Sequence, residues 1–125
     1  MAKIILLVED NDDIRYALRV LLELRGFTII EATDGREALH ATLKHAPGLI
    51  LMDLTLPRVD GVESTRIIRA NPATARIPIL AVSSSALHYK NQAMFAGCNE
   101  VVTKTEFIDN MDALLEKYLG VASHL

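Results

Sequence analysis

Leu-Ile-Leu-Met-Asp-Leu-Thr-Leu-Pro-Arg-Val-Asp-Gly, residues 49–61, is the stretch that decides the fold. Its first four residues are apolar without alternation, which is typical of a strand buried on both faces of a parallel sheet. Asp53 follows them directly, and Pro57 and Gly61 then break the extended chain. A carboxylate between apolar neighbours needs water, a cation or hydrogen bonds to stay ionised. Asp53 either caps the loop after the strand or belongs to a functional site, and the other strands decide between these interpretations.

Composition limits the class of protein. The chain has 125 residues, of which 50% are hydrophobic and 23% charged, so we expect one domain over residues 1–125 with a full core. No apolar run approaches a bilayer span and the N-terminus lacks a signal-peptide pattern, so we expect a cytoplasmic protein without a membrane partner. A net charge of −3 without a basic stripe argues against nucleic-acid binding. The single cysteine, Cys98, is expected to be a small buried residue in a reducing compartment.

Strand and helix patterns alternate five times along the chain. Besides residues 49–52, strands are predicted at residues 3–8, 27–32, 77–82 and 101–102. Helices are predicted at residues 12–25, from Asp34 towards His45, from Asp60 to near Asn71, from the residues after Ser85 to Gly97, and over 107–118. This order predicts an α/β fold with a mostly or wholly parallel five-stranded sheet. Right-handed crossovers then place five helices on both faces of the sheet.

Several polar and apolar residues have ordinary structural explanations. Asp34 and Asp60 each precede a glutamate by three residues, which is typical of helix N-caps. Met94 and Phe95 are expected to be core residues. The four histidines, which lack the spacing of metal ligands, are expected on the surface: His40, His45, His88 and His124.

Chemically active residues stand where the apolar runs end. The first strand ends in Glu9 and Asp10, the third in Asp53, the fourth in Ser83 and the fifth in Lys104. Ligands of such sheets bind beyond the carboxyl ends of the strands, where the strand order reverses. If the order is 2-1-3-4-5, as in flavodoxin-like doubly wound sheets, the first and third strands are neighbours about 5 Å apart. All three acids then share one pocket.

The pocket suits metal-assisted phosphoryl chemistry. Two carboxylates about 4 Å apart repel by roughly 4 kcal/mol at an effective dielectric of 20, so three of them need a counter-charge. All-oxygen ligation with room for water and phosphate oxygens suits Mg²⁺. Lys104 and Ser83 are suited to phosphoryl oxygens, and Asp53 is the nucleophile that could carry the phosphoryl group as a mixed anhydride.

These motifs resemble the receiver domain of bacterial two-component response regulators. The resemblance rests on residues 9–11, on 51–57 with Asp60-Gly61, on 78–83, and on Gly97 leading to Lys104. It implies that Glu9, Asp10, Asp53 and the backbone carbonyl of Thr55 organise Mg²⁺. It also implies that Asp53 is the phosphoacceptor and that Ser83 and Lys104 grip the phosphoryl group. Single-domain chemotaxis and phosphorelay regulators of this family have a similar length.

The resemblance also implies partners. The phosphoryl donor would be a sensor histidine kinase or a histidine phosphotransfer protein. The downstream protein would bind the fourth helix, fifth strand and fifth helix, at about residues 87–96, 101–103 and 107–119. Two departures affect this output: Thr105 replaces the proline that usually follows the lysine, and Val101 replaces the usual aromatic switch residue.

Other functions fit the sequence less well. A haloacid-dehalogenase-like phosphohydrolase has a second acid two residues after its nucleophile, and Thr55 stands there. A flavodoxin-like FMN carrier needs a phosphate-binding loop after the first strand, but Glu9 and Asp10 stand there and would repel the phosphate. A receiver-like adaptor that works without phosphate would have little reason to present all five site residues. We therefore expect a phosphoacceptor rather than an enzyme with a turned-over substrate.

Overall fold

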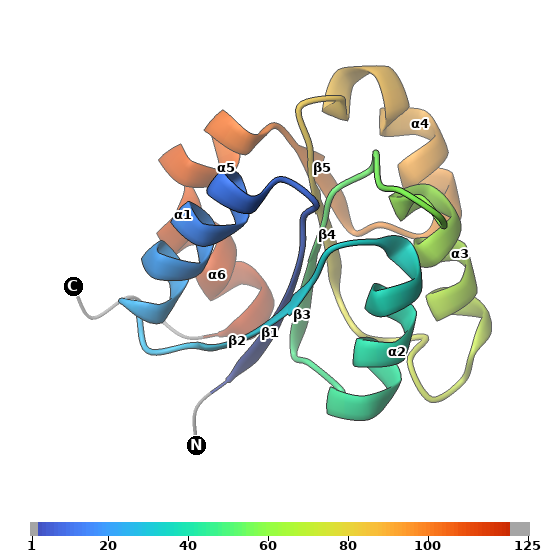
Figure 1. The fold of residues 1–125 in the computed structure, drawn as a ribbon, viewed down its shortest axis with the longest axis horizontal. Helices are drawn as coiled ribbons and strands as arrows, with labels where there is room; N and C mark the ends of the chain where they lie inside the picture. The colour runs from blue at the N-terminus through green and yellow to red at the C-terminus, as the bar shows by residue number, and fades with distance from the viewer. Residues whose placement is uncertain (1–2, 121–125) are drawn as a thin grey trace.

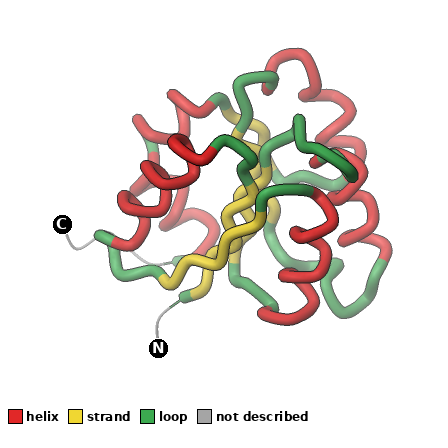
Figure 2. Tube along the Cα trace, in the orientation of Figure 1, coloured by secondary structure: helices red, strands yellow, loops and turns green. Residues whose placement is uncertain are grey.

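The computed structural model describes residues 3–120, which form one parallel sheet and six helical segments (Figures 1 and 2). The strands are β1 (Ile4–Val8), β2 (Thr28–Ala32), β3 (Leu49–Met52), β4 (Ile79–Val82) and β5 (Glu100–Val102). The helices are α1 (Asp12–Glu23), α2 (Gly35–His45), α3 (Gly61–Ala70), α4 (Ala86–Ala96), α5 (Lys104–Asp109) and α6 (Met111–Leu119). The strand order is β2-β1-β3-β4-β5, as predicted.

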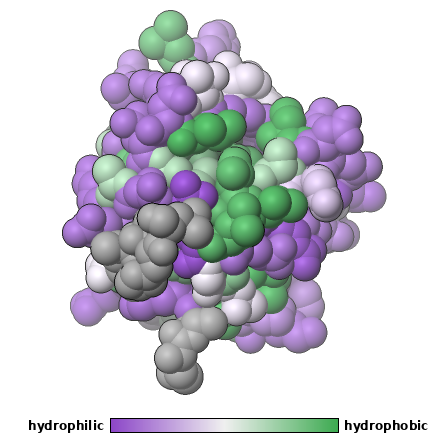
Figure 3. Space-filling view, turned by 90° about the vertical axis from the view of Figure 1, so that its left-hand side faces the viewer, coloured by the Kyte–Doolittle hydropathy of each residue, from purple (hydrophilic) through white to green (hydrophobic). Residues whose placement is uncertain are grey.

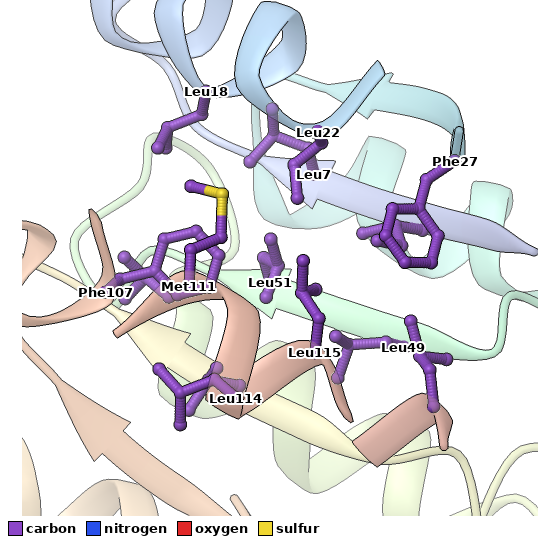
Figure 4. Close-up of a cluster of buried hydrophobic side chains, with 14 of the residues drawn as sticks. Leu7, Leu18, Leu22, Phe27, Leu49, Leu51, Phe107, Met111, Leu114 and Leu115 are labelled. Carbon is purple, nitrogen blue, oxygen red and sulfur yellow. The ribbon is translucent and has the colours of Figure 1, made fainter. Parts of the chain in front are cut away.

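Helices cover both faces of the sheet, so each central strand is buried on two sides (Figure 1). Alternate residues of a strand point to opposite faces. Leu7 and Leu51 accordingly belong to a core beneath α1, α5 and α6, whereas Leu6 and Ile50 belong to a second core beneath α2, α3 and α4. Figure 4 shows the first of these cores, in which Phe107 points towards the leucines of the sheet. This two-sided burial explains why the strand sequences are apolar without alternation.

The strand register aligns the carboxyl ends of neighbouring strands. Val8 of β1 is paired with Met52 of β3, and the backbone N–H of Asp53 donates to the Val8 carbonyl at 3.1 Å. Glu9 and Asp53 are therefore the first residues beyond two adjacent strands. The backbone N–H of Ser83 donates to the Val102 carbonyl at 3.1 Å, which aligns β4 with β5 in the same way.

The predicted helix caps are confirmed. The Asp34 carboxylate accepts the backbone N–H of Glu37 at 2.8 Å, and the Asp60 carboxylate accepts the N–H of Glu63 at 2.8 Å. Both bonds satisfy N–H groups that lack a partner within their own helix. Cys98 is buried, as predicted.

Two predictions about the helices were wrong. Met94 and Phe95 are not core residues: their exposed fractions are 44% and 93%. The small residues Ala86, Ala93 and Ala96 form the buried side of α4 instead, and Leu87, like Met94 and Phe95, is exposed. The last predicted helix is divided into α5 and α6 at Asn110, whose side-chain amide donates to the Glu106 carbonyl at 2.9 Å. Such a side-chain bond to the backbone competes with helix continuation.

The surface predictions are otherwise consistent with the structure. His40 and His88 are exposed and His45 is half-buried, whereas His124 lies outside the described residues. None of the helices in residues 3–120 combines the length and apolar character needed to cross a membrane. Figure 3 shows the side of the molecule where α1, α5 and α6 lie, and apolar side chains gather near its middle among polar ones.

Candidate phosphoacceptor and metal site

Asp53 lies at the centre of a buried polar pocket, with only 4% of its surface exposed. Its Oδ1 accepts a hydrogen bond from the Ser83 hydroxyl at 2.8 Å and a longer one from the Thr55 backbone N–H at 3.3 Å. Its Oδ2 is 3.5 Å from the Lys104 ammonium nitrogen. Ser83 itself is fully buried, and its hydroxyl oxygen also accepts the backbone N–H of Ser85 at 3.1 Å. Asp53, which follows β3, is therefore contacted by residues that come after β4 and β5.

Glu9 forms the second half of the pocket. It is 2% exposed, its Oε1 is 2.6 Å from the Lys104 ammonium nitrogen, and its Oε2 accepts the backbone N–H of Asn11 at 3.0 Å. Lys104 thus lies between two buried carboxylates and is closer to Glu9 than to Asp53. Asp10, by contrast, is exposed at the mouth of the pocket.

Burial and pairing shift the acid–base behaviour of this pocket. Burial raises the pKa of Glu9, although the Lys104 ammonium and the Asn11 N–H offset part of that rise. Burial alone would lower the pKa of Lys104, but the attraction of Glu9 and Asp53 outweighs it, so the pKa of Lys104 is raised. Lys104 is therefore a positive charge at neutral pH.

The three acids fit a divalent metal. Carboxylate oxygens of Glu9, Asp10 and Asp53 all lie within 4.8 Å of one another. An all-oxygen cluster with one exposed member suits Mg²⁺, which binds few carboxylates and keeps several waters. Thr55 is exposed, and its backbone N–H donates to Asp53 Oδ1, so the Thr55 backbone lies at the same pocket. Its carbonyl as a fourth ligand stays a prediction.

The N-terminal cap of α5 fixes the position of Lys104. Thr103 precedes the helix, and its hydroxyl accepts the backbone N–H of Glu106 at 3.0 Å. The Glu106 carboxylate in turn accepts the backbone N–H of Thr103 at 2.8 Å. This reciprocal capping box fixes Lys104 as the first residue of α5, in a chain where Thr105 stands in place of proline.

Gly61 permits the close approach of α3 to the phosphoacceptor loop. A Cβ atom added to Gly61 would lie 2.0 Å from the Asp53 carbonyl oxygen and 2.8 Å from the Leu54 Cα atom. No side chain fits at these distances without a shift of the backbone. Gly61 is therefore part of what holds Asp53 in place, a role beyond ending the extended chain.

Comparison with models of known protein families gives a match over most of the chain. The sequence model described as "Response regulator receiver domain" matches residues 5–116. This chain belongs to the response-regulator receiver family. A receiver domain is a phosphoacceptor switch rather than a conventional enzyme, and the Glu9, Asp10 and Asp53 cluster of this receiver is consistent with a magnesium-binding phosphorylation site.

Individual relatives cover nearly the whole receiver. The polar-differentiation response regulator DivK of Brucella anthropi is 32% identical over 123 residues, which are 98% of this chain and 100% of the relative. The receiver domain of a Pseudomonas aeruginosa sensor histidine kinase, solved with magnesium in its active-site cleft, is 29% identical with a TM-score of 0.88. That match covers 97% of this chain and 100% of the solved one. The phosphorylated cyanobacterial phytochrome response regulator RcpA is 27% identical, with a TM-score of 0.78 and 98% coverage of both chains.

The structure brings all predicted site residues together and adds others. Glu9, Asp53, Ser83 and Lys104 are linked by direct contacts, with Asp10 beside them. Sequence reasoning missed the positioning roles of Asn11 and of the Thr103–Glu106 pair. A signal for the latter exists, because a threonine followed three residues later by glutamate is the pattern of a capping box.

Proposed function

We propose that Asp53 is the phosphoacceptor of this receiver and that Ser83 and Lys104 bind the transferred phosphoryl group. The observation that carries the proposal is the unequal way in which the two Asp53 oxygens are held. Oδ1 accepts bonds from Ser83 and Thr55, whereas Oδ2 has only the 3.5 Å contact to Lys104 among residues 3–120. Oδ2 is therefore the oxygen freer to attack a phosphorus atom.

The proposed reaction transfers a phosphoryl group from a histidine of the donor protein to Asp53. A bond forms from an Asp53 oxygen to phosphorus while the bond between phosphorus and a donor histidine nitrogen breaks. Ser83 can then donate its hydrogen bond to a phosphoryl oxygen instead of to Asp53. The Lys104 ammonium can move from Glu9 to pair with the phosphoryl group. Both side chains are already within 3.5 Å of the nucleophile, so little movement is needed.

Glu9, Asp10, Asp53 and the Thr55 carbonyl are proposed to hold Mg²⁺, supported by the clustering of the three carboxylates. The ion supplies positive charge that shields Asp53 and the phosphoryl oxygens from one another. Lys104 contacts both Glu9 and Asp53 and adds a second positive charge beside them.

Receiver domains imply a histidine kinase as a partner. We propose that a sensor histidine kinase or a histidine phosphotransfer protein in the cytoplasm phosphorylates this receiver. We further propose that a downstream protein binds the output face, defined as residues 87–96, 101–103 and 107–119. Leu87 and Phe95 support this face, because 91% and 93% of their surfaces are exposed. Large apolar side chains exposed together on one element are typical of a protein-binding surface.

Intact-mass measurement after incubation with acetyl phosphate and Mg²⁺ tests the proposal. The natural chain should gain one phosphoryl group, and Asp53→Asn should gain none. Ser84→Ala, a substitution of an exposed neighbour of Ser83, should be phosphorylated like the natural chain. Equal phosphorylation of Asp53→Asn would refute the assignment. A phosphohydrolase is disfavoured because Thr55 occupies the place of the second acid.

A further inference from the structure

A groove of about 750 Å³ lies between α2 and the outer edge of the sheet, which is formed by β2. α2 and β2 lie next to one another in Figure 1. Ile30 of β2 and Ala41 of α2 contribute apolar surface to the groove, and Arg58 from the loop after β3 lines it as well. The remaining lining residues are mostly charged or polar, and the phosphoacceptor proposal uses none of them.

The acidic side chains of this α2 groove already have partners. Glu31 is 3.1 Å from the Arg19 guanidinium of α1. Asp34 caps α2 and is paired with Arg58, and the cap is the main reason that its pKa is lowered. Glu37 accepts two hydrogen bonds from the loop before α2. The three carboxylates are therefore largely satisfied within the protein.

The basic side chains on α2 do not have such partners. Arg36, His40 and Lys44 follow one another at intervals of four residues, and all three are exposed and line the groove. None has a side-chain hydrogen bond or ion pair within residues 3–120. Neutral histidine still carries one N–H donor, so the row offers donors in either charge state of His40. The groove thus presents a row of unused donors from one arginine, one histidine and one lysine.

We propose that the α2 groove binds an extended acidic segment of a partner protein, with carboxylates at alternate positions. Residues four apart on a helix are separated by about 6 Å along its axis. Side chains on the same face of an extended strand are separated by about 6.6–6.8 Å. Alternate carboxylates of an extended segment therefore match Arg36, His40 and Lys44 in turn.

The groove fits a peptide better than a phosphate chain or a nucleic acid. Glu31, Asp34 and Glu37 lie inside it and repel a densely charged polyanion, and the net charge of the protein is −3. Ile30 and Ala41 offer nothing to phosphates, but they accommodate the apolar residues that alternate with acids in a peptide. Charge complementarity of this kind favours association and selects partners.

Amide chemical shifts of the full chain test the proposal, with a blocked peptide of alternating Glu and Val as the probe. The peptide should shift amides between residues 30 and 45. Arg36→Glu with Lys44→Glu should weaken binding by at least about ten-fold. Arg66→Glu with Arg76→Glu makes the same charge change at two exposed residues outside the groove, and should leave the affinity within about two-fold.

Three results would overturn the proposal. These are no shift at the groove at about 1 mM peptide, equal binding by both double variants, or tighter binding of inorganic polyphosphate at the same residues. A peptide of alternating Lys and Val should not bind. Both double variants should still be phosphorylated on incubation with acetyl phosphate, so failure of this proposal is separable from failure of the Asp53 assignment.

Discussion

The phosphoacceptor pocket and helix α4 place their side chains in opposite ways. In the pocket, Glu9 and Asp53 are charged groups that are almost fully buried and paired with Lys104. On α4, Leu87 and Phe95 are large apolar groups that are almost fully exposed. Both arrangements depart from ordinary burial, in which charges face water and large apolar groups face the core. The proposed function assigns phosphoryl chemistry to the first departure and partner binding to the second.

Two phenylalanines provide the largest expected contrast between a core residue and the α4 surface. Phe107 is fully buried, whereas Phe95 is 93% exposed. Phe107→Ala should lower the free energy of unfolding by about 3–5 kcal/mol, because it leaves a cavity in the core beneath α1, α5 and α6. Phe95→Ala should change it by no more than about 0.5 kcal/mol. Urea unfolding of both variants measures the difference, and a large loss for Phe95→Ala would show that the Phe95 side chain is packed rather than exposed.

Asp10 should have the next largest effect, on metal binding rather than on folding. Asp10→Ala should weaken Mg²⁺ binding at least about ten-fold, equivalent to about 1.4 kcal/mol, because it removes one of three clustered carboxylates. Asp12→Ala is the matched control, since Asp12 is a nearby exposed acid paired with Arg15. Calorimetry is the suitable assay, because the chain has no tryptophan. Unchanged affinity in Asp10→Ala would exclude Asp10 as a ligand.

Lys104 should have a smaller effect of opposite sign. Its ammonium is 2.6 Å from Glu9 and so competes with a metal ion for the same carboxylate. Lys104→Met should therefore bind Mg²⁺ about three-fold to ten-fold more tightly. Lys117→Met removes a lysine that pairs with Glu100 far from the acid cluster, and should leave the affinity unchanged. Weaker binding in Lys104→Met would show that the lysine organises the metal site instead of competing for it.

Val101 should have the smallest effect on output. It is half-buried against the core beneath α2, α3 and α4, and a β-branched side chain has few rotamers to exchange. Addition of beryllofluoride, a phosphoryl mimic, should shift the amides of residues 83–90 most and the far side of α6 little. Val101→Ala should preserve this pattern and partner binding. Loss of partner binding with intact phosphorylation would contradict the passive role of Val101.

The fold and the clustering of the main site residues could be predicted because their signals lie in short stretches of sequence. Four continuous apolar residues before Asp53 indicate a two-sided strand, and parallel strands bring their ends together at one edge. Phe95 could not be placed in this way, because it is small residues elsewhere on α4 that decide which side of the helix is buried. The division of the last helix at Asn110 was missed for a similar reason, since a side-chain bond to the Glu106 carbonyl becomes apparent only in three dimensions.

The most direct test of the account is to identify the phosphorylated residue itself. Borohydride reduces an aspartyl phosphate to homoserine, which remains in the chain and can be located by peptide sequencing. After incubation with acetyl phosphate and Mg²⁺, we predict homoserine at position 53 and unmodified aspartate at position 10. Homoserine at position 10, or phosphoryl incorporation without homoserine at position 53, would contradict the central claim that Asp53 accepts the phosphoryl group.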